Sequence, residues 1–169
     1  MTRLAILLQP LWPLVALVAS LAMLAAAHSF ERFGGLNPCA LCLKQRDVYW
    51  GAAAIAALGF AAIRFWPRVT LQRAAAALLG LAFLTGSIVA LYHVGVEQGL
   101  VNATCDVVDP SRIRAFDVNA TFQAPNCDEI AWSMFGISMA GYNAMISLAL
   151  ATMSFLIAFA PAQAAQEEV

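Results

Sequence analysis

The chain has 169 residues, about the length of one domain. Hydrophobic residues make up 62% of it and charged residues 11%, whereas soluble domains average roughly half and a quarter. These proportions exclude an ordinary water-soluble protein, and a formal net charge of −1 leaves no basic face for nucleic acid. A mean hydropathy of +0.77 indicates an integral membrane protein.

Four uncharged, apolar stretches are long enough to cross a bilayer, which takes about 20 helical residues. They predict spans at about 8–28, 46–64, 73–95 and 137–159, joined by loops at about 29–45 and 96–136 and by a turn at about 65–72. Each span must satisfy its own backbone hydrogen bonds in lipid, and no alternating pattern suggests a barrel. We therefore expect one domain over residues 1–169, an all-α bundle of four transmembrane helices.

The first apolar stretch also fits a cleaved signal peptide, with Arg3 as its basic region and 25–27 as a small-residue cleavage site. It is longer than the usual 7–15 apolar residues of such a peptide, which favours a span. In both cases residue 29 emerges on the far side of the membrane.

The short turn between the second and third spans carries Arg64, Arg68 and Arg73 and no acidic residue. Basic residues in short loops mark the cytoplasmic side, although the first loop is also basic. This orientation places both termini in the cytoplasm and both larger loops on the opposite side. All four cysteines lie in those two loops, which suits an oxidising compartment such as the bacterial periplasm.

The first loop ends in NPCALCLKQR, which places Cys39 and Cys42 at the expected start of the second span. Pro38 suits a first helical turn, and the positive end of the helix dipole favours a thiolate. Arg46 follows Cys42 by four residues and Cys39 by seven, hence on the same helical face. Its cation can activate a sulfur or hold an oxygen of a small cofactor, although an interfacial anchor is the plainer interpretation.

A CxxC pair is also compatible with a structural disulfide or with half of a zinc site. Zinc is disfavoured because the other cysteines are 22 positions apart and the histidines, His28 and His93, are isolated in the sequence. We therefore expect no metal.

The second loop holds Cys105 and Cys127. A disulfide between them would close a loop of about 20 residues and stabilise the fold by around 3 kcal/mol, while two cysteine pairs on one face also permit thiol–disulfide exchange. His93, at the end of the third span, lies on the same side and is a candidate for lining a cofactor pocket. Residues 109–118 are compatible with a short amphipathic helix on the membrane surface.

Together these residues resemble the disulfide bond formation protein B family, DsbB, of bacterial inner membranes. PCALCLKQR has the family's PCxLCxxxR form, YHVGVEQ is similar to its segment at the end of the third span, and ATCD and CDEIAWSMFGISMAGYN are similar to its segments around the third and fourth cysteines. The resemblance covers most of the chain.

The resemblance implies a protein-disulfide oxidoreductase that reoxidises a periplasmic, thioredoxin-like partner, DsbA, and reduces a membrane quinone, either ubiquinone or menaquinone. It implies catalytic disulfides Cys39–Cys42 and Cys105–Cys127. Cys105 would meet the partner with Cys127 as its companion, and Cys39 would accept electrons from that pair. Cys42 would face the quinone as a thiolate, Arg46 would hold its oxygen, and His93 would lie nearby.

Two departures from the family pattern are a somewhat shorter interval between Cys105 and Cys127 and an acidic tail with Glu167 and Glu168. Two other functions stay open. One is a non-catalytic four-span scaffold with structural disulfides; the other is a paralogue with the same chemistry and a dedicated partner.

Overall fold

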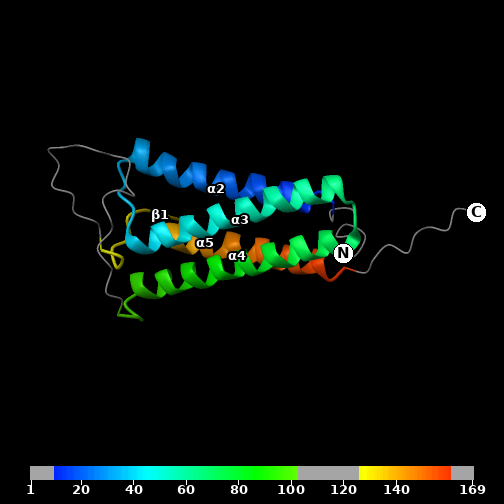
Figure 1. The fold of residues 1–169 in the computed structure, drawn as a ribbon. Coiled ribbons are helices and arrows are strands. Elements are labelled where there is room, and N and C mark those ends of the chain that lie inside the picture. Colours follow the sequence, from blue (N-terminus) through cyan, green and yellow to red (C-terminus); the bar gives the residue numbers. More distant parts are fainter. Residues whose placement is uncertain (1–9, 103–125, 161–169) are drawn as a thin grey trace, which may run out of the picture.

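The structure is a computed structural model that describes residues 10–102 and 126–160. In these ranges four long helices lie side by side as a bundle: α2 (Trp12–Gly34), α3 (Ala40–Phe65), α4 (Val69–Glu97) and α5 (Met139–Ala158) (Figure 1). All four are long and apolar enough to cross a membrane. The expected four-helix membrane fold is confirmed.

Several helices run beyond the predicted spans. α2 continues to Gly34 and α3 already begins at Ala40, so part of the expected loop at 29–45 is helical. The apolar stretches are shorter than α2 and α3, because the backbone hydrogen bonds of a helix continue into residues with polar side chains. Cys105 and the expected surface helix at 109–118 lie outside the described residues.

Local signals in the sequence account for the helix ends. Pro13 lies in the first turn of α2, and Gly35 ends that helix with φ 65°, a left-handed conformation that suits glycine. Cys39 caps α3, because its sulfur accepts a hydrogen bond from the Cys42 N–H at 3.2 Å. Ser138 caps α5 in the same way, accepting from the Gly141 N–H at 3.1 Å.

A short antiparallel hairpin precedes α5 and consists of β1 (Ser133–Met134) and β2 (Ile137–Ser138). Its two-residue turn places Phe135 at φ 52° and Gly136 at φ 78°, the pair of positive values that a type I′ turn requires. The sequence analysis did not expect this hairpin. It fixes the direction in which the chain enters α5.

The bundle interior is built largely from small side chains. α3 buries Ala52 and Ala56 at a four-residue spacing, and α4 buries Ala76 and Gly80 in the same way. Such pairs let helices approach closely, which is how membrane helices associate without a hydrophobic driving force. Large residues such as Leu58, 73% exposed, point outward, as expected for a lipid-facing surface.

The two ends of the bundle differ. At one end the α3–α4 turn carries Arg64 and Arg68. At the other end lie the α2–α3 connection, the end of α4 and the hairpin before α5, on the left in Figure 1. The latter end contains Cys39, Cys42 and the candidate site.

Candidate functional site

The CxxC pair lies where the sequence predicts it, at the N-terminus of α3. Cys39 is the capping residue and Cys42 lies in the first turn, so their sulfur atoms come within 2.7 Å of each other. Both are free thiols in this structure rather than the predicted disulfide. Because one helical turn already brings the sulfurs together, the Cys39–Cys42 disulfide remains our proposal for the oxidised protein.

Cys127 lies beside this pair. Its side chain is 1% exposed and shares an apolar cluster with Cys39, Leu41 and Val96. Its sulfur is disulfide-bonded, while the predicted partner, Cys105, lies outside the described residues. The fold thus brings the polypeptide around the fourth cysteine next to the CxxC motif, 85 positions earlier in the chain (127 − 42).

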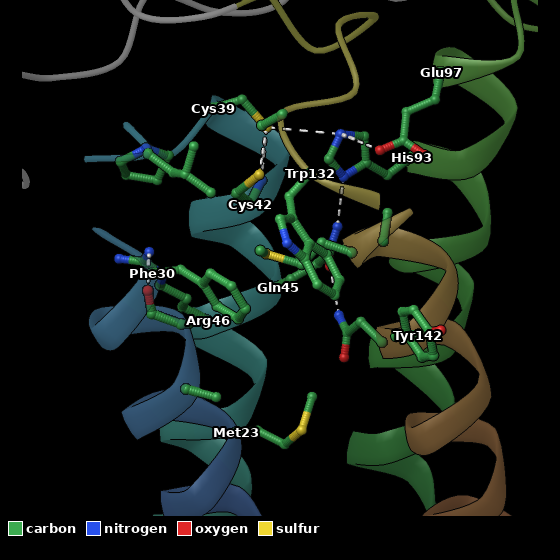
Figure 2. A pocket seen from close by; sticks show the side chains of 18 of the residues that line it. Met23, Phe30, Cys39, Cys42, Gln45, Arg46, His93, Glu97, Trp132 and Tyr142 are labelled. Carbon is green, nitrogen blue, oxygen red and sulfur yellow. Dashed lines mark hydrogen bonds and ion pairs between the residues drawn. The ribbon is translucent and has the colours of Figure 1, made fainter. Parts of the chain in front are cut away.

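His93 of α4 faces the same sulfurs (Figure 2). Its Nε2 atom lies 3.7 Å from Cys39 Sγ and 3.9 Å from a carboxylate oxygen of Glu97. Its Nδ1 atom lies 2.8 Å from the Gln45 side-chain nitrogen. Sequence analysis placed His93 near a cofactor pocket without foreseeing that it contacts a cysteine, because the two residues are 54 positions apart.

The Cys39 thiol is poised to ionise. A hydrogen bond from Cys42, and then the interaction with His93, lower the pKa of Cys39 from 9.0 to about 5, although burial acts in the opposite direction. A thiolate is the reactive form in disulfide exchange. Cys39 can therefore act as a nucleophile or as a good leaving group at neutral pH.

Arg46 has a partner that sequence analysis missed. Its guanidinium donates to the Glu31 carboxylate at 2.6 Å and to the Ala27 carbonyl at 3.3 Å, both on α2. The side chains of Arg46 and Glu31 are only 14% and 12% exposed, so this ion pair is largely shielded from water. Arg46 therefore joins α3 to α2 and carries a compensated charge, where the sequence suggested a cation facing two sulfurs.

A metal centre must be considered again, since Cys39, Cys42 and His93 offer three ligand atoms within 4.8 Å of one another. His93 is isolated in the sequence, but folding brings it to the CxxC motif. The distance between the sulfurs, 2.7 Å, is shorter than zinc ligands require, so the absence of a metal remains our proposal. Two thiolates bound to one zinc ion at about 2.3 Å in a tetrahedron lie about 3.8 Å apart. The spacing suits a dithiol that closes to a disulfide.

A cavity of about 300 Å³ opens beside Cys42 among the four helices, and all three predicted cofactor residues, Cys42, Arg46 and His93, line it. Its walls are mainly apolar and aromatic. The Trp132 ring lies 5.2 Å from that of Phe30 and 6.1 Å from that of Tyr142, centroid to centroid (Figure 2). Such a mixture of aromatic walls and few polar groups is typical of a small-molecule site.

Sequence analysis overlooked Gln45, Asn143 and Trp132 as site residues. A signal was present for the first two, because polar side chains within membrane spans usually face the bundle interior and mark functional sites. Trp132 carried no such signal, since its place in the cavity depends on the hairpin that follows it.

Comparisons with known proteins show the family of the chain. The family model described as Disulfide bond formation protein DsbB matches residues 9–157. Disulfide bond formation protein B 2 of Pseudomonas putida is 32% identical over 86% of this chain and 89% of its own length. Disulfide bond formation protein B of Methylococcus capsulatus is 32% identical over 80% of this chain and 85% of its own.

No solved structure matches the chain. The family match covers most of the sequence and includes the CxxC motif, Arg46, His93 and Cys127, which the fold gathers at one end of the bundle. The chain belongs to the disulfide bond formation protein B family, DsbB.

Proposed function

We propose that this protein is a disulfide-generating oxidase of the bacterial inner membrane that reoxidises a DsbA-like, thioredoxin-fold partner and reduces membrane quinone. One observation carries the proposal: the CxxC pair lines a cavity between the helices and lies in one buried cluster with disulfide-bonded Cys127. A cysteine pair in that position can exchange with a second pair and still meet a lipid-soluble acceptor.

The steps balance as two-electron transfers. The partner's dithiol reduces a Cys105–Cys127 disulfide through a mixed disulfide at Cys105, and the partner becomes oxidised. The loop dithiol then reduces the Cys39–Cys42 disulfide by the same exchange chemistry, through Cys127 and Cys39. Cys127 and Cys39 belong to one buried cluster, which supports this order. Each exchange conserves disulfides, so a net disulfide appears only when Cys39 and Cys42 lose two electrons.

The cavity fits a quinone head group. Its volume of about 300 Å³ is at the lower end for ligand pockets, and Phe30, Trp132 and Tyr142 provide flat apolar walls. Arg46 and His93 are polar groups suited to the carbonyl oxygens. A bound quinone would supply an acceptor for two electrons and two protons. Both cysteines line the cavity, and we assign the role of electron donor to Cys42 because Cys39 also faces His93 and shares a buried cluster with Cys127.

We further propose that the cysteine-bearing end faces the periplasm and that both termini lie in the cytoplasm. The arginines at the opposite end support this orientation, because basic residues in short loops stay on the cytoplasmic side. The scaffold alternative has less support, since a scaffold has no need of a CxxC pair and a histidine lining one cavity.

The test is to mix the purified, oxidised protein with a reduced DsbA-like partner and either ubiquinone or menaquinone, and to follow quinol formation and partner thiols together. We expect quinol to form in equal amount to oxidised partner. The Cys42→Ser protein is the matched control, because it keeps the loop pair and the fold. If the intact protein changes neither quinone nor partner thiols, the proposed function is wrong.

A further inference from the structure

Four polar side chains form a connected series inside the membrane-spanning part of the bundle. Gln45 and Tyr49 come from α3, His93 from α4 and Asn143 from α5, and their residues are only 4–8% exposed. Polar groups in this environment are costly unless they bond to one another, and those that persist usually serve function. The series starts at the candidate site and runs away from it into the bundle.

Each link is a hydrogen bond between helices. The Tyr49 hydroxyl donates to Asn143 Oδ1 at 2.6 Å, and Asn143 Nδ2 donates to Gln45 Oε1 at 2.5 Å. Gln45 Nε2 then lies 2.8 Å from His93 Nδ1 (Figure 2). Ser147 supports the orientation of Asn143, because its hydroxyl donates to the same Oδ1 at 3.3 Å. Each amide accepts on one side and donates on the other, so the series has a direction.

This direction determines what His93 presents to the cysteines. Since Gln45 donates to Nδ1, the proton of the neutral ring lies on Nε2. Nε2 in turn faces two acceptors, Cys39 Sγ at 3.7 Å and Glu97 Oε1 at 3.9 Å. The partners of Nδ1 and of Nε2 therefore favour the same tautomer, in which the N–H group points toward the Cys39 sulfur.

Within residues 10–102 and 126–160, the charged and titratable neighbours of this arrangement are few. α3 contributes Cys42, α4 contributes Glu97, and the segment before α5 contributes the backbone of Cys127 against His93. The Arg46–Glu31 pair on the α2 side is mutually compensated. α5 carries no charged residue, so it acts on the site through hydrogen bonds. The bond that reaches the site is the one from Asn143 to Gln45.

We propose that Gln45, Asn143 and Tyr49 are positioning residues, which hold His93 with its Nε2–H toward Cys39 and thereby keep that sulfur ready to react as a thiolate. The inference deepens the proposed function and rests on it for its purpose, because thiolate at Cys39 serves exchange with the loop pair. It assigns a role to α5, a helix that contributes no cysteine.

The test measures how alkylation of Cys39 by iodoacetamide depends on pH, in a Cys42→Ser background with the other disulfide intact. Gln45→Met keeps the length of the side chain and removes its amide. We expect the midpoint of alkylation to rise by about one pH unit, which leaves about tenfold less thiolate below the midpoint. Ser87→Ala is the control: it removes another buried hydrogen bond between α4 and α5, from Ser87 to the Ala144 carbonyl, away from His93.

A second arm distinguishes positioning from general damage. In a His93→Gln background, adding Gln45→Met should leave the midpoint unchanged, because its effect passes through His93. Asn143→Leu replaces Gln45→Met if the latter does not fold, as judged by thermal unfolding. The proposal is overturned if the midpoint stays unchanged in the folded variant, if Ser87→Ala moves it equally, or if the shift persists without His93. No quinone or partner is present, so failure here differs from failure of the proposed function.

Discussion

The two halves of the bundle interior hold together by different interactions. Away from the cysteines the core consists mainly of apolar residues such as Ala16, Leu79 and Phe83, packed between the four helices. One buried hydrogen bond, from Trp12 to Ser154, joins α2 to α5 there. Toward the cysteines, ion pairs and hydrogen bonds join the helices, notably Arg46 with Glu31 and Gln45 with His93. Small-residue packing helps membrane helices to associate, whereas buried polar side chains are costly and usually mark functional sites, which applies to the polar half. Its chemistry therefore points to function.

Replacement of Cys42 should have the largest effect on activity. Cys42→Ser removes one sulfur of the CxxC pair while the cap at Cys39 and the apolar half remain. We expect quinol formation to be lost completely, because no Cys39–Cys42 disulfide can form. The loop disulfide should still oxidise one equivalent of reduced partner, measured by counting the partner's thiols. Continued quinol formation by this variant would show that electrons leave by another route.

At pH 7 the ionised fraction of Cys39 should be about a hundredfold larger than that of an ordinary thiol. Its pKa, lowered to about 5 by Cys42 and His93, keeps it ionised at neutral pH, whereas a thiol with a pKa near 9 is about 1% ionised there. The alkylation rate of the reduced protein should stay level from about pH 9 to about pH 6 and fall as pH drops through about 5. Mass spectrometry of the Cys39 peptide measures it. A rate that rises tenfold per unit up to pH 9 would contradict the site geometry.

Loss of the buried ion pair should have an intermediate effect. Arg46→Gln removes the cation that lines the cavity and leaves Glu31 without its partner. We expect the KM for quinone to rise by about tenfold, equivalent to about 1.4 kcal/mol, while both disulfides still form. Lys44→Gln, which removes an exposed cation two residues earlier on α3, is the control. An unchanged dependence of rate on quinone concentration would exclude Arg46 from the quinone site.

A change in the apolar half should affect stability far more than activity. Leu79 is fully buried, so Leu79→Ala should lower the free energy of unfolding by about 2–5 kcal/mol through lost contacts and a cavity. Quinol formation by the folded variant should remain within about twofold of the original. Denaturant unfolding in detergent and the quinone assay measure the two effects. If activity falls as much as in Arg46→Gln, the apolar half also serves catalysis, which contradicts the division between the two halves.

The same division explains how much could be predicted from the sequence. The spans follow from apolar runs, and the place of Cys39 and Cys42 at a helix start follows from Pro38 and the adjoining span. These features depend on neighbours along the chain. Little more is needed to predict the apolar half, because many combinations of alanines inside and leucines facing the lipid pack equally well.

The polar half could not be predicted in the same way, because its contacts join distant positions. Arg46 of α3 bonds to Glu31 of α2. Gln45 bonds to His93 and Asn143, which lie 48 and 98 positions later in the chain. Helical periodicity shows which face a residue occupies and leaves open which residue of another helix it meets. The hairpin that brings Trp132 to the cavity also depends on a local turn at Phe135 and Gly136, which hydrophobic patterning does not reveal.

The most direct test of the account is a single turnover without any partner. The Cys39–Cys42 pair is reduced, the protein is mixed with one equivalent of quinone in the absence of oxygen, and quinol and disulfides are then quantified. The account predicts one quinol per protein and a new Cys39–Cys42 disulfide, identified by mass spectrometry. Absence of quinol, or a new disulfide at any other pair, would contradict it.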